Sequence, residues 1–133
     1  MIGSGPLSLK LKDVDYPFEL YLEGELEHSQ VISSMYESDI LIQAYTQPEG
    51  LSTVTLEGLA AGMLVVTTPL SKEGGLDKCI NYIPGSFSEL PHLLLECRDR
   101  NESRSELVTI GKRFVKAGLT WDVVSEKLVK RDY

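Results

Sequence analysis

Two short apolar runs, residues 39–43 (DILIQ) and 64–67 (LVVT), flank a segment of helix length, and this arrangement constrains the fold most. Runs with so few polar residues are typical of strands that are buried on both faces, as in parallel sheets. The segment between them, residues 51–62, ends in Gly62, and glycine is the residue type that most often terminates a helix. A strand, a helix and a strand in this order predict a parallel crossover unit, and therefore an α/β fold.

Further elements are predicted before and after this unit. Residues 18–22 (FELYL) and 81–84 (NYIP) are predicted as strands and residues 29–37 as a helix. These runs make about four strands, whereas a doubly wound sheet usually has about five or six. Residues 1–6 (MIGSGP) read as the end of a strand and the turn after it, so either the domain is small or its first part is missing. We expect a single domain over residues 1–133, with a Rossmann-like parallel sheet flanked by helices.

The last third of the chain is predicted to be helical. Three apolar faces, within residues 87–94, 107–114 and 121–128, are interpreted as surfaces that pack against the core. The charged stretch at residues 98–104 (RDRNESR) is interpreted as a solvated turn between two helices.

The charge balance limits the partners that this chain can bind. Thirteen Lys and Arg residues face twenty Asp and Glu residues, which gives a net charge of −7. A general nucleic-acid binder needs a basic face, and a surface that binds anionic membranes needs one too, so neither class is expected. A single nucleotide held at a helix N-terminus is compatible with this charge.

The sequence also predicts the compartment. It has no apolar run of about 18 residues that could span a membrane, and its N-terminus lacks the pattern of a signal peptide. Cys79 and Cys97 are interpreted as reduced thiols, and His28 and His92 as surface residues. We therefore expect a cytoplasmic protein with no metal site and no cofactor.

The loop at residues 46–50 is the strongest candidate for a ligand site. Ligands of open parallel sheets bind beyond the carboxyl ends of the strands, and this loop follows the predicted strand at residues 39–43. Gly50 would let the backbone approach a ligand closely. The N–H groups of Leu51, Ser52 and Thr53 would open the next helix without intrahelical acceptors, which makes an anion site. A diphosphate is the natural occupant.

Two carboxylates flank this predicted anion site. Glu49 lies just before the helix, and Glu57 lies about two turns into it. Ionised carboxylates accept hydrogen bonds through two oxygens, which suits the neighbouring hydroxyls of a ribose or a hexose. The spacing alone favours a plain structural interpretation, in which Glu49 is a turn residue and Glu57 an exposed helix residue.

A resemblance covers most of the chain. The segment from Glu49 to Glu57 resembles the E-x7-E motif of the retaining GT-B glycosyltransferases of the large group-one family. Other segments resemble further motifs of that family in the same order: GSGP at residues 3–6, YLEG at 21–24, YESDIL at 36–41, EGLAAGMLVV at 57–66, GGLD at 74–77 and LTW at 119–121. GGLD departs from the family pattern by an Asp in place of Glu, and Thr46 and Gln47 replace the usual Pro-Ser of the loop.

The resemblance implies roles for the residues of this motif. It assigns Glu49 to the sugar hydroxyls near the reacting carbon, as the catalytic residue, and Glu57 to the ribose hydroxyls. It assigns the backbone N–H groups of Gly50, Leu51 and Ser52 to oxygens of the sugar or the diphosphate.

The resemblance also implies a place for the nucleotide base and a set of partners. The base would lie near Glu25 and Leu26 through backbone contacts, with residues 3–5 lining the pocket. The fold implied is the C-terminal, donor-binding part of a GT-B fold, an incomplete half of it. The family's N-terminal acceptor domain and the basic pair that neutralises the diphosphate have no counterpart in this sequence.

These points predict a glycosyltransferase domain that moves a sugar from a nucleotide-diphosphate sugar to an acceptor hydroxyl with retention. As an isolated chain it is expected to be inactive, because the missing acceptor domain or a separate chain would complete the cleft. The alternatives are a module that binds a nucleotide or nucleotide sugar without catalysis, and one half of a split enzyme. The face that the missing domain would cover is also a predicted surface for homodimerisation.

Overall fold

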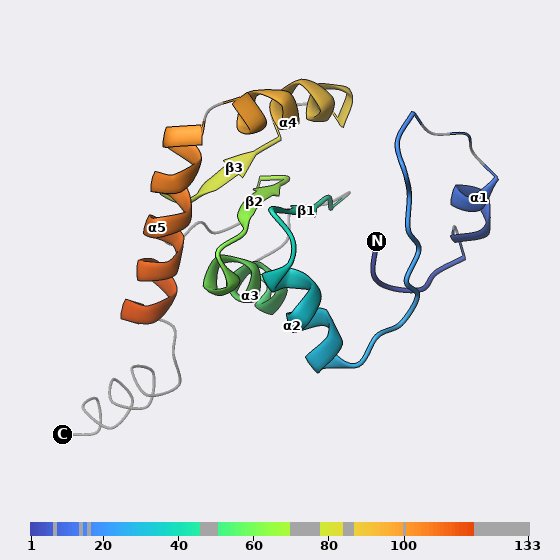
Figure 1. Ribbon diagram of the computed structural model, residues 1–133, viewed down its shortest axis with the longest axis horizontal. Helices are drawn as coiled ribbons and strands as arrows, with labels where there is room; N and C mark the ends of the chain where they lie inside the picture. Colours follow the sequence, from blue (N-terminus) through green and yellow to red (C-terminus); the bar gives the residue numbers. More distant parts are fainter. Residues whose placement is uncertain are drawn as a thin grey trace. The chain divides into compact units, whose positions relative to one another are not determined.

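The computed structural model describes residues 1–6, 8–13, 15, 17–45, 51–69, 78–83, 87–99 and 101–118. The chain divides into two compact units, Met1–Ser34 and Met35–Tyr133, and each is described by itself. The larger unit contains the sheet and most of the helices (Figure 1).

The larger unit is built on a parallel sheet of three strands. The strands are β1 (Ile40–Gln43), β2 (Leu64–Thr67) and β3 (Ile80–Tyr82), in the order β1-β2-β3. Gln43 of β1 lies opposite Thr67 of β2, which in turn lies opposite Tyr82 of β3, so the carboxyl ends of the strands meet at one edge. Helix α3 (Thr53–Ala61) connects β1 to β2. The prediction of a Rossmann-like α/β fold, with a parallel sheet flanked by helices, is confirmed.

Alternation along β2 creates two apolar clusters, one on each face of the sheet. Val65 points to one face and packs with Leu59 of α3, against Ile110 and Phe114 of α5 (Asn101–Gly118). Its neighbours in β2 point to the other face and pack with Cys97 of α4 (Leu90–Asp99). All four residues of β2 are buried, which is what its uninterrupted apolar sequence predicted. The burial predicted for residues 39–43 is wrong, because β1 is at the edge of the described sheet and Ile42 is 43% exposed.

The two ends of α3 are set by its capping residues. Gly62 adopts a left-handed conformation with φ of 91°, and its N–H donates to the carbonyl oxygens of Gly58 at 3.1 Å and Leu59 at 3.2 Å. The predicted stop at Gly62 is therefore correct. At the other end the helix begins at Thr53 and not at Leu51, because Ser52 is extended (φ −87°, ψ 153°) and serves as the N-cap.

The prediction of a solvated turn at residues 98–104 is wrong for most of that stretch. Helix α4 continues to Asp99 and α5 begins at Asn101, so residues 98–99 and 101–104 are helical. Arg104 forms an ion pair with Asp39, the residue before β1, and its side chain is only 28% exposed. Arg and Glu are good helix formers, so a charged run can be helical for most of its length. A short 3-10 helix, η2 (Phe87–Glu89), precedes α4, and the predicted face at residues 121–128 lies outside the described residues.

The smaller unit contains helix α1 (Ser8–Lys12) and the start of α2 (His28–Tyr36), which matches the helix predicted at residues 29–37. The strand predicted at residues 18–22 is not formed, and the chain there is irregular. A single parallel bridge joins Ile2 to Gly24, with the N–H of Gly3 donating to Gly24 O at 2.6 Å. A strand needs a partner along its length, and the side chains of Phe18 and Tyr21 are more than 60% exposed (62% and 63%), so neither face of this segment is buried.

Candidate functional site

The predicted site residues fall into three groups. Glu49 and Gly50 lie outside the described residues, as do residues 74–77 of the GGLD motif. Leu51, Ser52 and Glu57 lie in the larger unit, at or within α3. Glu25 and Leu26 lie in the smaller unit.

The N-terminus of α3 lies at the carboxyl edge of the sheet. The side chain of Ser52 caps the helix, because its hydroxyl accepts the N–H of Thr55 at 3.1 Å. The first helical N–H groups, those of Thr53 and Val54, have no carbonyl available within the helix. These N–H groups and the helix dipole together favour a bound anion.

A closed set of polar contacts holds this end of the helix to β1, and the sequence analysis missed it. Gln43 is the last residue of β1, and its Nε2 donates to Ser52 Oγ at 3.2 Å. Its Oε1 accepts a hydrogen bond from the hydroxyl of Thr55, which is fully buried. Ser52 Oγ and Thr55 Oγ1 lie 2.9 Å apart. The available signal was a carboxamide at the end of an apolar strand (DILIQ), a position where a buried polar group needs partners.

These contacts restrict what Ser52 and Leu51 can offer to a ligand. Ser52 Oγ already accepts two hydrogen bonds, from the N–H of Thr55 and from Gln43 Nε2. A hydroxyl has two acceptor lone pairs, so both are in use. The side chain of Leu51 packs against the core cluster that contains Leu59 and Val65. These two side chains are therefore already engaged within the protein, and both residues could contribute to a ligand only through their backbone.

The loop after β1 is tied to the end of β2 at the same edge. The N–H of Thr68 donates to Gln43 O at 3.2 Å, and the N–H of Tyr45 donates to Thr68 Oγ1 at 3.1 Å. Thr67, opposite Gln43 in the ladder, is fully buried, and its hydroxyl has no hydrogen-bond partner in the described part of the chain. The edge thus combines a helix N-terminus with several hydroxyl and amide groups.

Glu57 lies on a different side of α3 from the packed residues. It follows Thr55 by two positions, which is about 200° around the helix axis. Thr55, Gly58 and Leu59 are buried, whereas Glu57 is half-buried. Glu57 is thus on a different side of α3 from the buried residues of the helix.

The smaller unit brings together the segments that were assigned to the base. The hydroxyl of Ser4 donates to the carboxylate of Glu25, and Gly3 and Gly24 are joined by the parallel bridge segment. A cavity of about 490 Å³ is lined by residues 1–6 together with Leu11, Lys12, Leu22 and Gly24. Gly3 (φ +118°) and Gly24 (φ +70°) both adopt backbone conformations that disfavour other residues. Glu25 is exposed and Leu26 half-buried.

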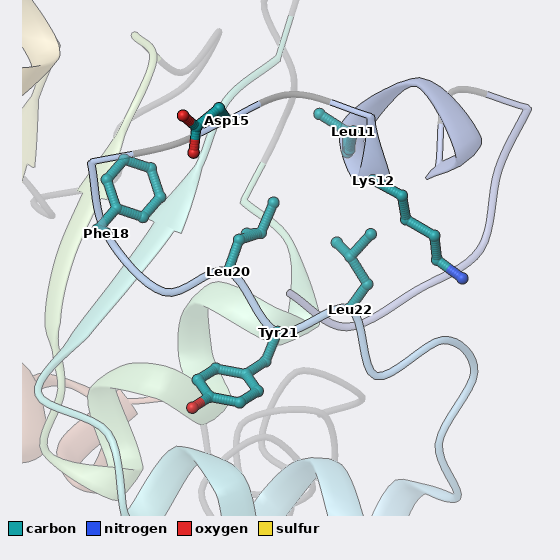
Figure 2. Close-up of a pocket in the computed structure, with 7 residues that line it drawn as sticks. All are labelled: Leu11, Lys12, Asp15, Phe18, Leu20, Tyr21 and Leu22. Atoms are coloured by element: carbon teal, nitrogen blue, oxygen red, sulfur yellow. The ribbon is translucent and has the colours of Figure 1, made fainter.

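A second cavity of this unit, of about 440 Å³, lies beside α1 (Figure 2). Figure 2 shows Leu20 and Leu22 on one side of the extended segment and the ring of Tyr21 on the other. The Tyr21 hydroxyl donates to the carboxylate of Glu19 at 2.7 Å, and this carboxylate raises the pKa of Tyr21 above its ordinary value. Neither Glu19 nor Tyr21 was predicted as part of a site.

The predictions for the cysteines and histidines can be compared with the structure. Cys79 and Cys97 are buried thiols, and His28 and His92 are exposed, as predicted. No group of three or more His, Cys, Asp or Glu side chains suited to a metal ion occurs among the residues that the structure describes. Across the same residues, the helices are all too short or too polar to span a bilayer.

The sequence was compared with known proteins. No protein-family model matches it, and no curated protein matches it.

Proposed function

We propose that this chain is the donor-binding domain of a retaining GT-B glycosyltransferase, which transfers a sugar from a nucleotide-diphosphate sugar to an acceptor hydroxyl. The observation that carries the proposal is the N-terminus of α3, which is capped by Ser52 and lies at the carboxyl edge of the parallel sheet. This is the position at which open α/β sheets bind their ligands. Glu49 precedes Ser52 by three residues in the sequence.

The proposed roles follow from the chemistry of each group. The backbone N–H groups at the start of α3, together with those of Gly50 and Leu51, would hold the diphosphate and stabilise the charge of the leaving group. Glu57 would accept hydrogen bonds from the ribose hydroxyls, and Glu49 from the sugar hydroxyls as positive charge develops.

Calorimetry with UDP, GDP and ADP tests the proposal on the chain itself. We expect one of the three to bind, and the matching nucleoside to bind more weakly, because the helix N-terminus contributes only to the diphosphate. The absence of binding by all three nucleotides would overturn the proposal.

A second experiment separates catalysis from binding alone. The chain would be mixed with an acceptor-binding domain of a GT-B enzyme that uses the same nucleotide, and release of the nucleoside diphosphate from its sugar donor would be followed. Turnover in the mixture, but not with the chain alone, supports a transferase domain. Tight nucleotide binding with no turnover in any mixture would favour the binding module instead.

A further inference from the structure

We infer that Gln43 is a positioning residue, which orients the first turn of α3 toward a bound diphosphate; the inference rests on the proposed function. Gln43 ends β1 and is half-buried. Its amide nitrogen donates to Ser52 Oγ at 3.2 Å, and its amide oxygen accepts from the Thr55 hydroxyl. A single side chain therefore holds both the N-cap residue and the third residue of the helix.

The three side chains form a closed ring of hydrogen bonds. Gln43 Nε2 donates to Ser52 Oγ, and the Thr55 hydroxyl donates to Gln43 Oε1. Ser52 Oγ and Thr55 Oγ1 lie 2.9 Å apart. Because the Thr55 proton is used on Gln43, the Ser52 hydroxyl is the donor of this third bond and closes the ring. Closing this ring requires a donor and an acceptor at the end of one side chain. A carboxamide provides both, whereas a carboxylate provides no donor and an aliphatic chain neither.

The ring determines which N–H groups face a ligand. It orients Ser52 so that its hydroxyl keeps the N–H of Thr55 occupied, at 3.1 Å. The N–H groups of Thr53 and Val54 are then the first-turn donors available to an anion, and their direction is fixed by the capped turn. If the cap is lost, the first turn frays and these donors lose their common direction.

The hydroxyl of Thr67 is a further polar group at the same edge of the sheet. Thr67 lies opposite Gln43 in the ladder and is fully buried, and its hydroxyl has no partner within the described ranges. Alternation along β2 places Thr67 on the same face as Val65, which packs with Leu59 of α3. The α3 side of this edge therefore carries one hydroxyl whose hydrogen bond is not used by the protein's own described groups.

The test compares Gln43→Met with Gln30→Met in the full chain. Both substitutions preserve the length of the side chain and remove a carboxamide that supports the start of a helix. Gln30 Oε1 accepts the N–H of Glu27 at 3.0 Å, at the start of α2. We expect Gln43→Met to weaken binding of the nucleoside diphosphate (UDP, GDP or ADP, whichever binds) roughly tenfold. The affinity for the matching nucleoside should not change, and Gln30→Met should change neither affinity.

Equal losses for the nucleoside and its diphosphate, or the same loss in Gln30→Met, would overturn the inference. Thr55→Val opens the same ring without changing Gln43 and should reproduce the selective loss if Gln43→Met does not fold. When the unsubstituted chain binds none of the three nucleotides, the proposed function fails. Amide hydrogen exchange then still tests Gln43, because the N–H of Thr55 should exchange faster in Gln43→Met, and unchanged exchange would show that Gln43 does not hold the turn.

Discussion

Gly58 of α3 packs so closely on Leu41 of β1 that a Cβ atom at Gly58 would lie 2.6 Å from Leu41 Cδ2. At the next residue of the helix, a Cβ atom at Gly111 of α5 would lie 2.7 Å from Leu59 Cδ2. Glycine therefore occurs at a close contact of α3 with the sheet and at a close contact of α3 with α5. The position of the helix, and with it the position of its N-terminus, depends on these two contacts.

Substitution Gly58→Ala should destabilise the protein even though alanine is the better helix former. Overpacking of a core costs about 1–3 kcal/mol, whereas replacing Gly by Ala in a helix contributes about 1 kcal/mol. We expect the free energy of unfolding in urea to fall by about 1 kcal/mol. Gly118→Ala is the matched control, since a Cβ atom there meets nothing within 4 Å, and it should be neutral or stabilising. A Gly58→Ala variant as stable as the unsubstituted chain would contradict the close packing.

Substitution of Gly62 tests the left-handed C-cap of α3. With φ of 91°, an alanine at this position should lower the free energy of unfolding by about 1–2 kcal/mol. Asparagine tolerates this conformation better, so Gly62→Asn should lose less than Gly62→Ala. Thermal and urea unfolding of both variants would measure the difference, and an equal loss in the two would argue against a conformational origin.

The hydrogen bond between Tyr21 and Glu19 should be visible in a titration. The neighbouring carboxylate raises the pKa of the Tyr21 phenol, because it accepts the phenol's hydrogen bond and disfavours a second negative charge. Glu19→Gln should therefore lower the pKa of Tyr21 toward its ordinary value. The change would be followed by ultraviolet absorbance of tyrosinate, with Tyr21→Phe used to identify the signal. An unchanged titration in Glu19→Gln would show that this contact does not persist in solution.

Substitution Glu57→Gln tests the proposed ribose contact. The amide keeps the size of the side chain but replaces a charged acceptor, so we expect roughly tenfold weaker binding of the nucleotide and of its nucleoside alike. This pattern differs from that of Gln43→Met, which should affect the diphosphate alone. Glu106→Gln, at an exposed position of α5, is the control and should leave both affinities unchanged. If Glu57→Gln binds the nucleotide as tightly as the unsubstituted chain, Glu57 does not contact the ribose.

The local sequence predicted the elements whose pattern is strongest. The buried strand of residues 64–67, the strand of residues 40–43 and the helix stop at Gly62 follow from apolar composition and from the backbone freedom of glycine. The candidate anion site at the start of α3 follows from the same pattern, because a helix that begins just after a parallel strand presents its N–H groups at the sheet edge.

Contacts between distant residues could not be predicted in this way. The pair of Arg104 and Asp39 joins residues 65 positions apart, and the ring at Gln43 joins the end of a strand to the first turn of a helix. The prediction of a strand at residues 18–22 was wrong for the same reason, because it also depends on distant residues. A strand forms only where a neighbouring strand pairs with its backbone N–H and C=O groups.

The amino-acid sequence by itself thus determined the order of strand, helix and strand and the residues that end the helix, because these depend on interactions within a few residues. Only the tertiary structure decided that Gln43 holds Ser52 and Thr55, that the hydroxyl of Ser52 is already used, and that Glu57 lies away from the packed side of α3. These features depend on how separate elements approach one another, and that approach is decided by the packing of side chains such as Leu41 against Gly58.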